Sequence, residues 1–238
     1  MYQRDYILRL IEQFTNAVAV LMGMKRNMKP HEAMELVGET YKKLFGLHPN
    51  LIRALSERDL IELLNRDGEA AAEKLLVIAG LMKEEADLSA ELGRPEDGYP
   101  LHLKALNLAL LATREDVASD LFDAPALIDG LTERLSRFEL PAETLTMLWP
   151  WYERTGRYAD AEDVLYELLE RHRRVQEPAA GGDAYAKLLA EARLFYERLL
   201  ETDEAALEAG RLPLDEVREA LGDVRAAEAA LRSGRADD

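Results

Sequence analysis

Apolar residues recur along the chain at intervals of three and four, the spacing that lines one face of an α-helix. In the first segment this stripe consists of Ile7, Leu10, Ile11, Phe14, Val18, Leu21 and Met22. It predicts a helix from about Arg4 to Lys25, with the stripe as the inner face of a helix bundle. Strict alternation of apolar and polar residues, the pattern of a half-buried strand, persists nowhere in the sequence. The chain is therefore expected to be all-α.

Helix-breaking and capping residues divide this pattern into roughly ten helices. Pro30 and Gly46 bracket the second helix, with proline near its start and glycine past its end. Ser56 begins a serine N-cap signature that precedes a short helix. A long helix is expected at 70–92, with a partner helix after the break at 93–95. The remaining helices are expected at 125–138, 141–154, 158–172, 184–209 and 213–232.

One stretch, 175–183, has the composition of a flexible connection, because it contains Pro178, Gly181 and Gly182. It predicts a boundary between a helical domain at 1–174 and a C-terminal helical hairpin at 184–232. The last residues, 233–238, are polar enough to form a tail.

The most specific local pattern spans Leu145 to Leu168, and it resembles one tetratricopeptide repeat, a helix-turn-helix unit with small residues where the helices meet. The matching positions are Leu145, Leu148, Tyr152, Gly156, Tyr158, Ala161, Leu165 and Leu168. The segment departs from that repeat at Trp149, at Pro150 and at Leu168, where a small residue is usual. Because one hairpin cannot bury both of its apolar faces, the resemblance implies a tetratricopeptide-like stack of antiparallel hairpins with irregular connectors.

A second resemblance concerns the family. The opening residues 1–14, together with 80–88 and 104–108, are similar to an uncharacterised bacterial family catalogued only as a domain of unknown function. The similarity covers most of residues 1–170. It implies an all-helical, tetratricopeptide-like cytoplasmic protein, and it supplies no catalytic residues.

Charge narrows the range of partners. Asp and Glu number 46 against 30 Lys and Arg, which gives a formal net charge of −16. Such a field repels phosphate backbones, so we expect no nucleic-acid partner. Residues 1–30 hold five cations and two anions, a local charge of +3, so the rest of the chain carries −19. The acidic body favours a protein or peptide partner with basic segments.

The apolar first segment raises the question of a membrane. Its uninterrupted apolar run is short and lacks the cleavage pattern of a secretory signal. No run approaches the roughly 20 apolar residues of a membrane span. We therefore expect a cytoplasmic protein without a membrane partner, in keeping with the absence of Cys.

Motifs for chemistry are absent from the sequence. Without Cys there are no thiolate nucleophiles and few routes to structural zinc. The four histidines lie at no ligand spacing, and no glycine-rich phosphate loop precedes a lysine. The carboxylates Glu84, Glu85 and Asp87 cluster on the long helix, where we expect a solvated face. We predict no catalytic residues, no metal site and no cofactor.

Aromatic residues give a better lead, because Trp149, Trp151 and Tyr152 cluster beside Pro150 and cannot all face one core. Exposed Trp and Tyr are enriched at interface hot spots, so these three are candidate partner-binding residues. The alternative is that all three wedge between neighbouring hairpins.

The leading hypothesis is a noncatalytic scaffold that binds a protein or peptide. One alternative is an enzyme with a carboxylate-lined interhelical pocket, for which a buried cluster of Asp, Glu and His would be evidence. Another is a helical regulator that senses a small ligand. Homodimerisation is a separate hypothesis, motivated by the leucine-rich C-terminal hairpin.

Overall fold

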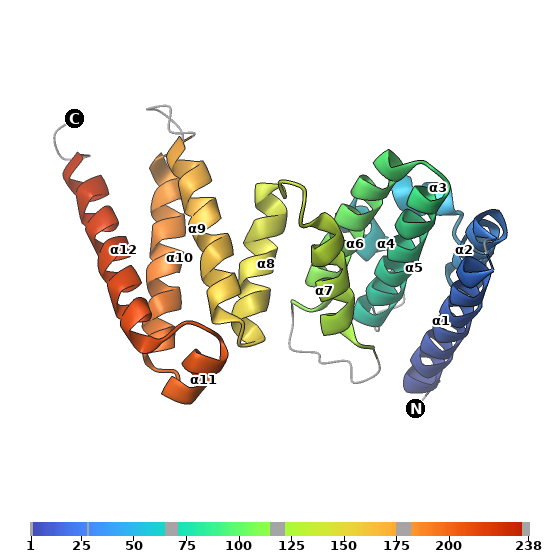
Figure 1. Cartoon of the computed structure of the whole chain (residues 1–238), viewed down its shortest axis with the longest axis horizontal. Coiled ribbons are helices and arrows are strands. Elements are labelled where there is room, and N and C mark those ends of the chain that lie inside the picture. The colour runs from blue at the N-terminus through green and yellow to red at the C-terminus, as the bar shows by residue number, and fades with distance from the viewer. Residues whose placement is uncertain (1, 28, 65–70, 115–121, 175–181, 235–238) are drawn as a thin grey trace. The chain divides into compact units, whose positions relative to one another are not determined.

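A computed structural model describes residues 2–27, 29–64, 71–114, 122–174 and 182–234, and in these ranges every regular element is helical (Figure 1). The all-α prediction is confirmed. The chain divides into two compact units, Met1–Leu140 and Pro141–Asp238, which are described separately below.

The first unit contains seven α-helices and one short 3₁₀ helix within its described residues. They are α1 (Tyr2–Arg26), α2 (Pro30–Phe45), α3 (Pro49–Ala54), α4 (Glu57–Leu64), α5 (Ala71–Glu91), η2 (Pro95–Asp97), α6 (Gly98–Ala112) and α7 (Ala124–Leu135). Consecutive long helices pack as pairs, α1 with α2 and α5 with α6. The tetratricopeptide-like stacking of such pairs stays a prediction.

Helix ends in the first unit follow the predicted signals. Gly46 ends α2 in the left-handed conformation, with φ of 67°, and its N–H bonds to the Lys42 carbonyl. Ser56 caps α4, since its Oγ accepts the Asp59 N–H at 3.1 Å. Gly93, with φ of 76°, makes the break after α5. The short helix α3 was not expected from the sequence.

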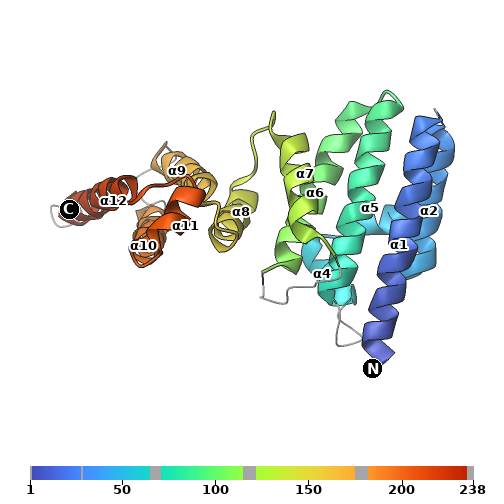
Figure 2. The ribbon, with the colours of Figure 1, turned by 60° about the horizontal axis from the view of Figure 1, so that its bottom comes forward.

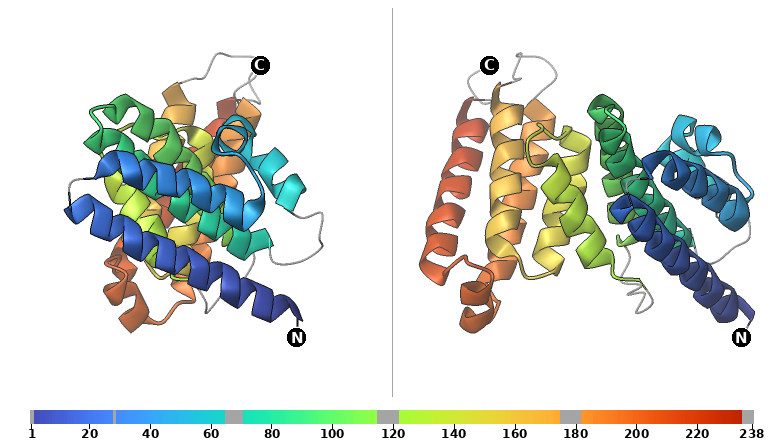
Figure 3. Two further views of the ribbon diagram at one scale, coloured as in Figure 1. Left: turned by 90° about the vertical axis from the view of Figure 1, so that its right-hand side faces the viewer. Right: turned by 45° about the vertical axis from the view of Figure 1, so that its right-hand side comes forward.

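Helix α5 is the centre of the first unit. It packs against α1, α2, α4, α6 and α7, and Figures 2 and 3 show it between α1 and α6. Nearly every residue from Leu75 to Ser89 is buried. At Gly80 the Phe14 ring lies where a Cβ would stand, 2.6 Å away, so glycine lets α1 approach α5. No long side of α5 faces water.

Helix α1 differs from α5 because most of it is uncovered. By length and composition Asp5–Arg26 could cross a membrane, the one such helix in the described ranges. This differs from the expectation that no segment approaches a membrane span. The expectation considered uninterrupted apolar runs, whereas a longer window tolerates Gln13 and Asn16. In the apolar window only 17% of the residues are fully buried, so the first unit covers α1 much less completely than α5.

The second unit contains five α-helices within its described residues: α8 (Ala142–Arg154), α9 (Tyr158–Arg174), α10 (Gly182–Leu200), α11 (Glu204–Ala209) and α12 (Leu214–Gly234). Helix α8 packs on α9, and α10 packs on both α9 and α12. Gly156 makes the turn between α8 and α9 with φ of 72°. The Ala159 N–H bonds to the Gly210 carbonyl at 3.0 Å, which ties the start of α9 to the end of α11.

The prediction of a single helix at 184–209 is wrong, because the structure has two helices there, α10 and α11. Glu201 and Thr202 close the end of α10 with tight i→i+3 bonds, to the Arg198 and Leu199 carbonyls. Asp203 is extended, with ψ of 136°, and the chain restarts as α11. The break turns Leu207 into the core, where its side chain is fully buried.

The predicted linker at 175–183 lies mostly outside the described residues, and its last two residues belong to α10. The division between units falls instead at Leu140–Pro141. Helices α9 and α10, on either side of the expected linker, pack against each other in the second unit. Of the expected tail, residues 233 and 234 belong to α12 and the rest lies outside the described residues.

Candidate functional site

The predicted aromatic anchors lie together in α8, and each is only 7% exposed. The Trp149 ring meets the Phe195 ring edge-on, with centroids 5.9 Å apart. The Arg157 guanidinium lies 4.4 Å from the centroid of the Tyr152 ring. These rings pack inside the second unit. Their role as partner anchors stays a prediction, with little ring surface open to a partner.

Trp149 has one further property. Its indole Nε1 is buried and has no hydrogen-bond partner among the described residues. Trp149 also borders a wide hollow of about 640 Å³ with Arg198 and Thr202. A buried, unbonded N–H carries a desolvation cost of about 1–3 kcal/mol. Trp149 therefore contributes to stability through its ring and not through its polar atom.

The carboxylates of α5 correct the sequence-based expectation. Glu84 and Glu85 are 7% and 2% exposed, and the Asp87 side chain is 14% exposed, so the expected solvated face is wrong. The reason is the position of α5, which is surrounded by other helices. Cations from those helices reach the carboxylates and replace the lost water.

Two groups of contacts make up this charged cluster of α5. In the first group, the Asp87 carboxylate is hydrogen-bonded to His102 Nε2 at 3.0 Å, to Arg134 Nε at 2.9 Å and to Lys83 Nζ at 3.2 Å. Lys25 from α1 bonds to Glu84 at 2.8 Å. The contacts join α1, α6 and α7 to the central helix.

In the second group, Glu85 pairs with Arg53 and accepts a hydrogen bond from the Tyr41 hydroxyl at 3.3 Å. Tyr41 is 1% exposed, whereas the Arg53 side chain is 42% exposed. This group joins α2 and α3 to α5. A pocket of about 400 Å³ lies beside it, bordered by Glu85, Arg53 and Lys104.

The two buried carboxyls differ in pKa. Burial raises the pKa of Glu85, and the opposing effect of Arg53 does not cancel it. Burial also acts to raise the pKa of Asp87, but hydrogen bonds from His102 and Arg134 outweigh it and hold that pKa well below its ordinary value. Asp87 is thus a fixed anion, whereas Glu85 ionises less readily than an ordinary glutamate.

The pocket beside Glu85 has few free groups. Lys104 donates to the carbonyls of Ile52 at 2.8 Å, Arg53 at 3.0 Å and Leu55, which caps the end of α3. Burial lowers the pKa of Lys104, partly offset by the charge on Glu57. The described residues contain no group of three or more side chains suited to hold a metal ion. The cluster is suited to fixing helices in place.

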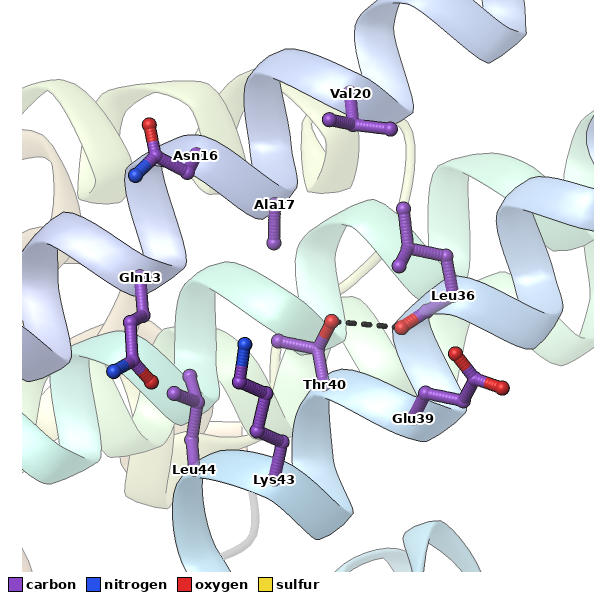
Figure 4. Close-up of a pocket in the computed structure, with 9 residues that line it drawn as sticks. All are labelled: Gln13, Asn16, Ala17, Val20, Leu36, Glu39, Thr40, Lys43 and Leu44. Atoms are coloured by element: carbon purple, nitrogen blue, oxygen red, sulfur yellow. Dashed lines mark hydrogen bonds between the residues drawn. The ribbon is translucent and has the colours of Figure 1, made fainter.

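The groove between α1 and α2 is a different surface, with a volume of about 510 Å³ and with free polar groups along its border (Figure 4). We call it the α1–α2 groove. Its apolar lining consists of Ala17 and Val20 from α1 and Leu36 and Leu44 from α2, and Val20 is 50% exposed. The Thr40 hydroxyl donates to the Leu36 carbonyl at 2.7 Å and is used within α2. An open, elongated apolar surface between two helices is suited to an amphipathic segment.

Four polar side chains border the α1–α2 groove, namely Gln13, Asn16, Glu39 and Lys43. All four are exposed, and none has a side-chain hydrogen bond or ion pair within the described ranges. Two carboxamides and an opposite-charge pair can bind main-chain or side-chain polar groups of a partner. Sequence reasoning missed this groove. The available signal was the position of Gln13 and Asn16, three residues apart on one side of the helix next to the apolar Ala17 and Val20.

Comparison with known proteins gives one match. The sequence profile of the family described as "Family of unknown function (DUF6483)" matches residues 1–228. No curated protein matches the chain, and neither does any solved structure. The predicted resemblance to a domain of unknown function is confirmed, and the match extends beyond residue 170 into α12. The chain belongs to DUF6483, a family of unknown function.

Proposed function

We propose that the protein is a noncatalytic, tetratricopeptide-like interaction module of the bacterial cytoplasm that binds a segment of another protein in the α1–α2 groove. One observation carries the proposal: an open apolar lining bordered by four polar side chains that have no partner in the described chain. Preformed grooves between helices bind amphipathic segments through apolar anchors and a few polar contacts.

The hairpin architecture supports the same function. At the tetratricopeptide-like positions, Leu145, Ala161, Leu165 and Leu168 are at most 2% exposed, and Gly156 has the conformation of a turn glycine. Burial of these residues within the α8–α9 pair is what a repeat unit requires. Proteins built from such pairs use their surfaces chiefly for binding, which is an analogy at the level of fold.

Charge defines the partner further. The net charge of −16 attracts basic segments over long range. Within the groove the charges are balanced, since Glu39 and Lys43 are both present. The best fit is an amphipathic helix with two or three apolar anchors and flanking Lys or Arg residues.

The alternative of a carboxylate-lined pocket has one observation in its favour, the pocket of about 400 Å³ beside Glu85. Asp87 and His102 lie 3.0 Å apart, but neither lines this pocket. Against catalysis, Arg53 neutralises Glu85, and Arg134 and Lys83 neutralise Asp87. A small ligand bound there would raise the thermal midpoint of the wild type and not of Glu85→Gln.

Photo-crosslinking tests the interaction function. A crosslinking amino acid at Val20, in the groove, is compared with one at Leu194, which is similarly exposed (46%) but lies in the second unit. We expect a defined partner at position 20 alone. Val20→Glu should then weaken binding of the purified partner at least about tenfold. Equal capture at both positions, or unchanged binding by Val20→Glu, would contradict the proposal.

A further inference from the structure

Helix α1 has more apolar surface than the first unit buries. Leu10 and Leu21 are at most 3% exposed, but Leu8 and Met22 keep 43% and 49% of their surface exposed. Ile11 and Val18 are partly covered. The stripe that the sequence assigns to an inner face therefore includes residues that still face solvent.

These residues have the spacing of a coiled-coil seam. Leu8, Ile11, Thr15, Val18 and Met22 follow one another at steps of three, four, three and four. This is the 3.5-residue repeat that two helices bury between them. We call these five residues the outer seam. Its length, about four turns of helix, is enough for a specific but modest interface.

The outer seam is separate from the α1–α2 groove. Each residue advances about 100° around a helix, so Val20 and Met22 lie on nearly opposite sides of α1. Both are about half exposed, at 50% and 49%. A partner on the seam would leave the groove open. The inference below therefore does not depend on the proposed function.

Charge along one flank of the seam favours a particular geometry. Asp5, Glu12 and Arg26 recur at multiples of seven residues, on the same side of the seam. All three are exposed and have no ion pair in the described part of the chain. The flank is thus acidic toward the N-terminus and basic at its end. An antiparallel pair of such helices places opposite charges together, whereas a parallel pair places like charges together.

We infer that the outer seam binds the same seam of a second copy of this chain, as an antiparallel pair about a two-fold axis. In the register that pairs Ile11 with Met22 of the second copy, Thr15 meets Val18 of the second copy. In the same register Asp5 and Arg26 of the second copy differ in level by two residues, about 3 Å along the axis, a step that a long arginine side chain spans, and the two-fold axis repeats each contact. A surface that matches itself in both apolar spacing and charge is what a symmetric dimer requires.

Other occupants fit less well. Helices that lie on anionic membranes carry Lys and Arg along their polar face and bulky aromatics on the other. The seam instead has Asp5 and Glu12 along its flank and Thr15 at its middle. The C-terminal hairpin is a weaker dimer surface, because Leu189, Leu199 and Leu221 are buried in the second unit. Its exposed leucines, Leu194 and Leu200, are six residues apart, which is not the spacing of a seam.

Sedimentation velocity over a wide concentration range tests the dimer with the full-length protein. We expect the 26.8 kDa chain to form a reversible particle of twice that mass. Met22→Glu should weaken dimerisation at least about tenfold, and Val20→Glu, equally exposed on the same helix, should not. Circular dichroism confirms that both variants remain folded. An invariant monomer, or equal effects of the two variants, overturns the inference.

Charge exchange tests the antiparallel geometry. Asp5→Arg alone and Arg26→Asp alone should each weaken the dimer, because each brings like charges together across the pair. The double variant should restore it, which a parallel pair would not do. Vesicles of phosphatidylcholine, with and without phosphatidylserine, test the membrane alternative. Seam-dependent binding to vesicles by a protein that stays monomeric in solution also overturns the inference.

Discussion

Substitution of Asp87 by asparagine tests whether the charged cluster holds the first unit together. The Asp87 side chain is 14% exposed and accepts contacts from His102, Arg134 and Lys83. Asparagine has nearly the same shape but no charge. The variant therefore removes the anion while leaving the three cationic or cation-capable partners in place.

The expected loss is about 2–3 kcal/mol of unfolding free energy, at or below the lower end of the range for breaking a buried ion pair. Two features of the structure reduce it. Lys83 keeps a second partner, Glu84, at 3.3 Å, and Arg134 is 43% exposed, so water can solvate its guanidinium. What remains is the cost of poorly bonded donors around position 87.

The positions of the two tryptophans allow the loss to be localised. Trp149 and Trp151 both lie in the second unit, so their fluorescence in urea reports on that unit, whereas circular dichroism reports on both. The loss should appear in the dichroism transition. Glu62→Gln is the matched control, since it removes the same charge from an exposed pair with Arg58 and should cost under about 0.5 kcal/mol. Equal costs for the two variants would refute the structural role of the cluster.

The contribution of Asp87 to stability depends on pH, and the direction of its pKa shift gives the sign of that dependence. Folding lowers the pKa of Asp87 below its ordinary value of 3.8. The unfolded chain therefore binds more protons near and below that pH, and the contribution of Asp87 is fully present above about pH 4. It is lost as the pH falls further, toward the pKa of the folded state. The difference between wild type and Asp87→Asn should be constant near neutral pH and shrink in acid.

Three further outcomes are expected. Burial raises the pKa of Glu85 above 4.5, so ionising it costs stability as the pH rises through its folded pKa. In urea titrations Glu85→Gln should therefore cost less than Asp87→Asn at pH 7, and the cost of Glu85→Gln should be larger in mild acid than at pH 7. Gly210→Ala should lower the unfolding free energy of the second unit by about 1–3 kcal/mol, followed by tryptophan fluorescence, because the new Cβ would lie 2.5 Å from the backbone oxygen of Gly156. Gly222→Ala has open space around its Cβ and should stabilise α12 by about 0.5–1 kcal/mol. In a dichroism melt, the unfolding free energy of Trp149→Phe should stay within about 1 kcal/mol of the wild type, since the substitution deletes an unbonded N–H. Trp149→Ala, which removes the whole ring, should cost about 3–5 kcal/mol. A large loss for the phenylalanine variant would mean that the indole N–H has a partner.

Local rules were sufficient to predict most of the helices. Periodicity located α1, α2 and α5, and the turns at Gly46, Gly93 and Gly156 all use left-handed glycines. The missed break at Thr202 has no glycine or proline. Its one local signal is Asp203, a residue type favoured at the N-cap, which holds that position before α11. Beyond the break, Leu207 is fully buried, and this tertiary contact is not readable from the local sequence.

The environment of the charged residues could not be predicted in the same way. Glu84, Glu85 and Asp87 look like a solvated face when α5 is considered alone. Apart from Lys83 on α5 itself, their cations come from distant positions: Lys25 lies 59 residues from Glu84, and Arg134 lies 47 residues from Asp87. Only the packing of five helices around α5 determines that these carboxylates are buried.

The first helix shows a further limit of periodicity. A stripe of apolar residues at helical spacing indicates that one face of the helix is covered, but it does not indicate which partner covers that face. In α1 the apolar stripe is wider than the face that packs on the neighbouring helices. Its adjacent residues Leu21 and Met22 are 0% and 49% exposed. The helix at the end of a stack of hairpins normally presents a polar outer face. An end helix that keeps an apolar seam and an apolar groove is explained if both are occupied in the assembled protein. The two surfaces lie on different sides of α1, so Val20→Glu and Met22→Glu should separate partner binding from self-association.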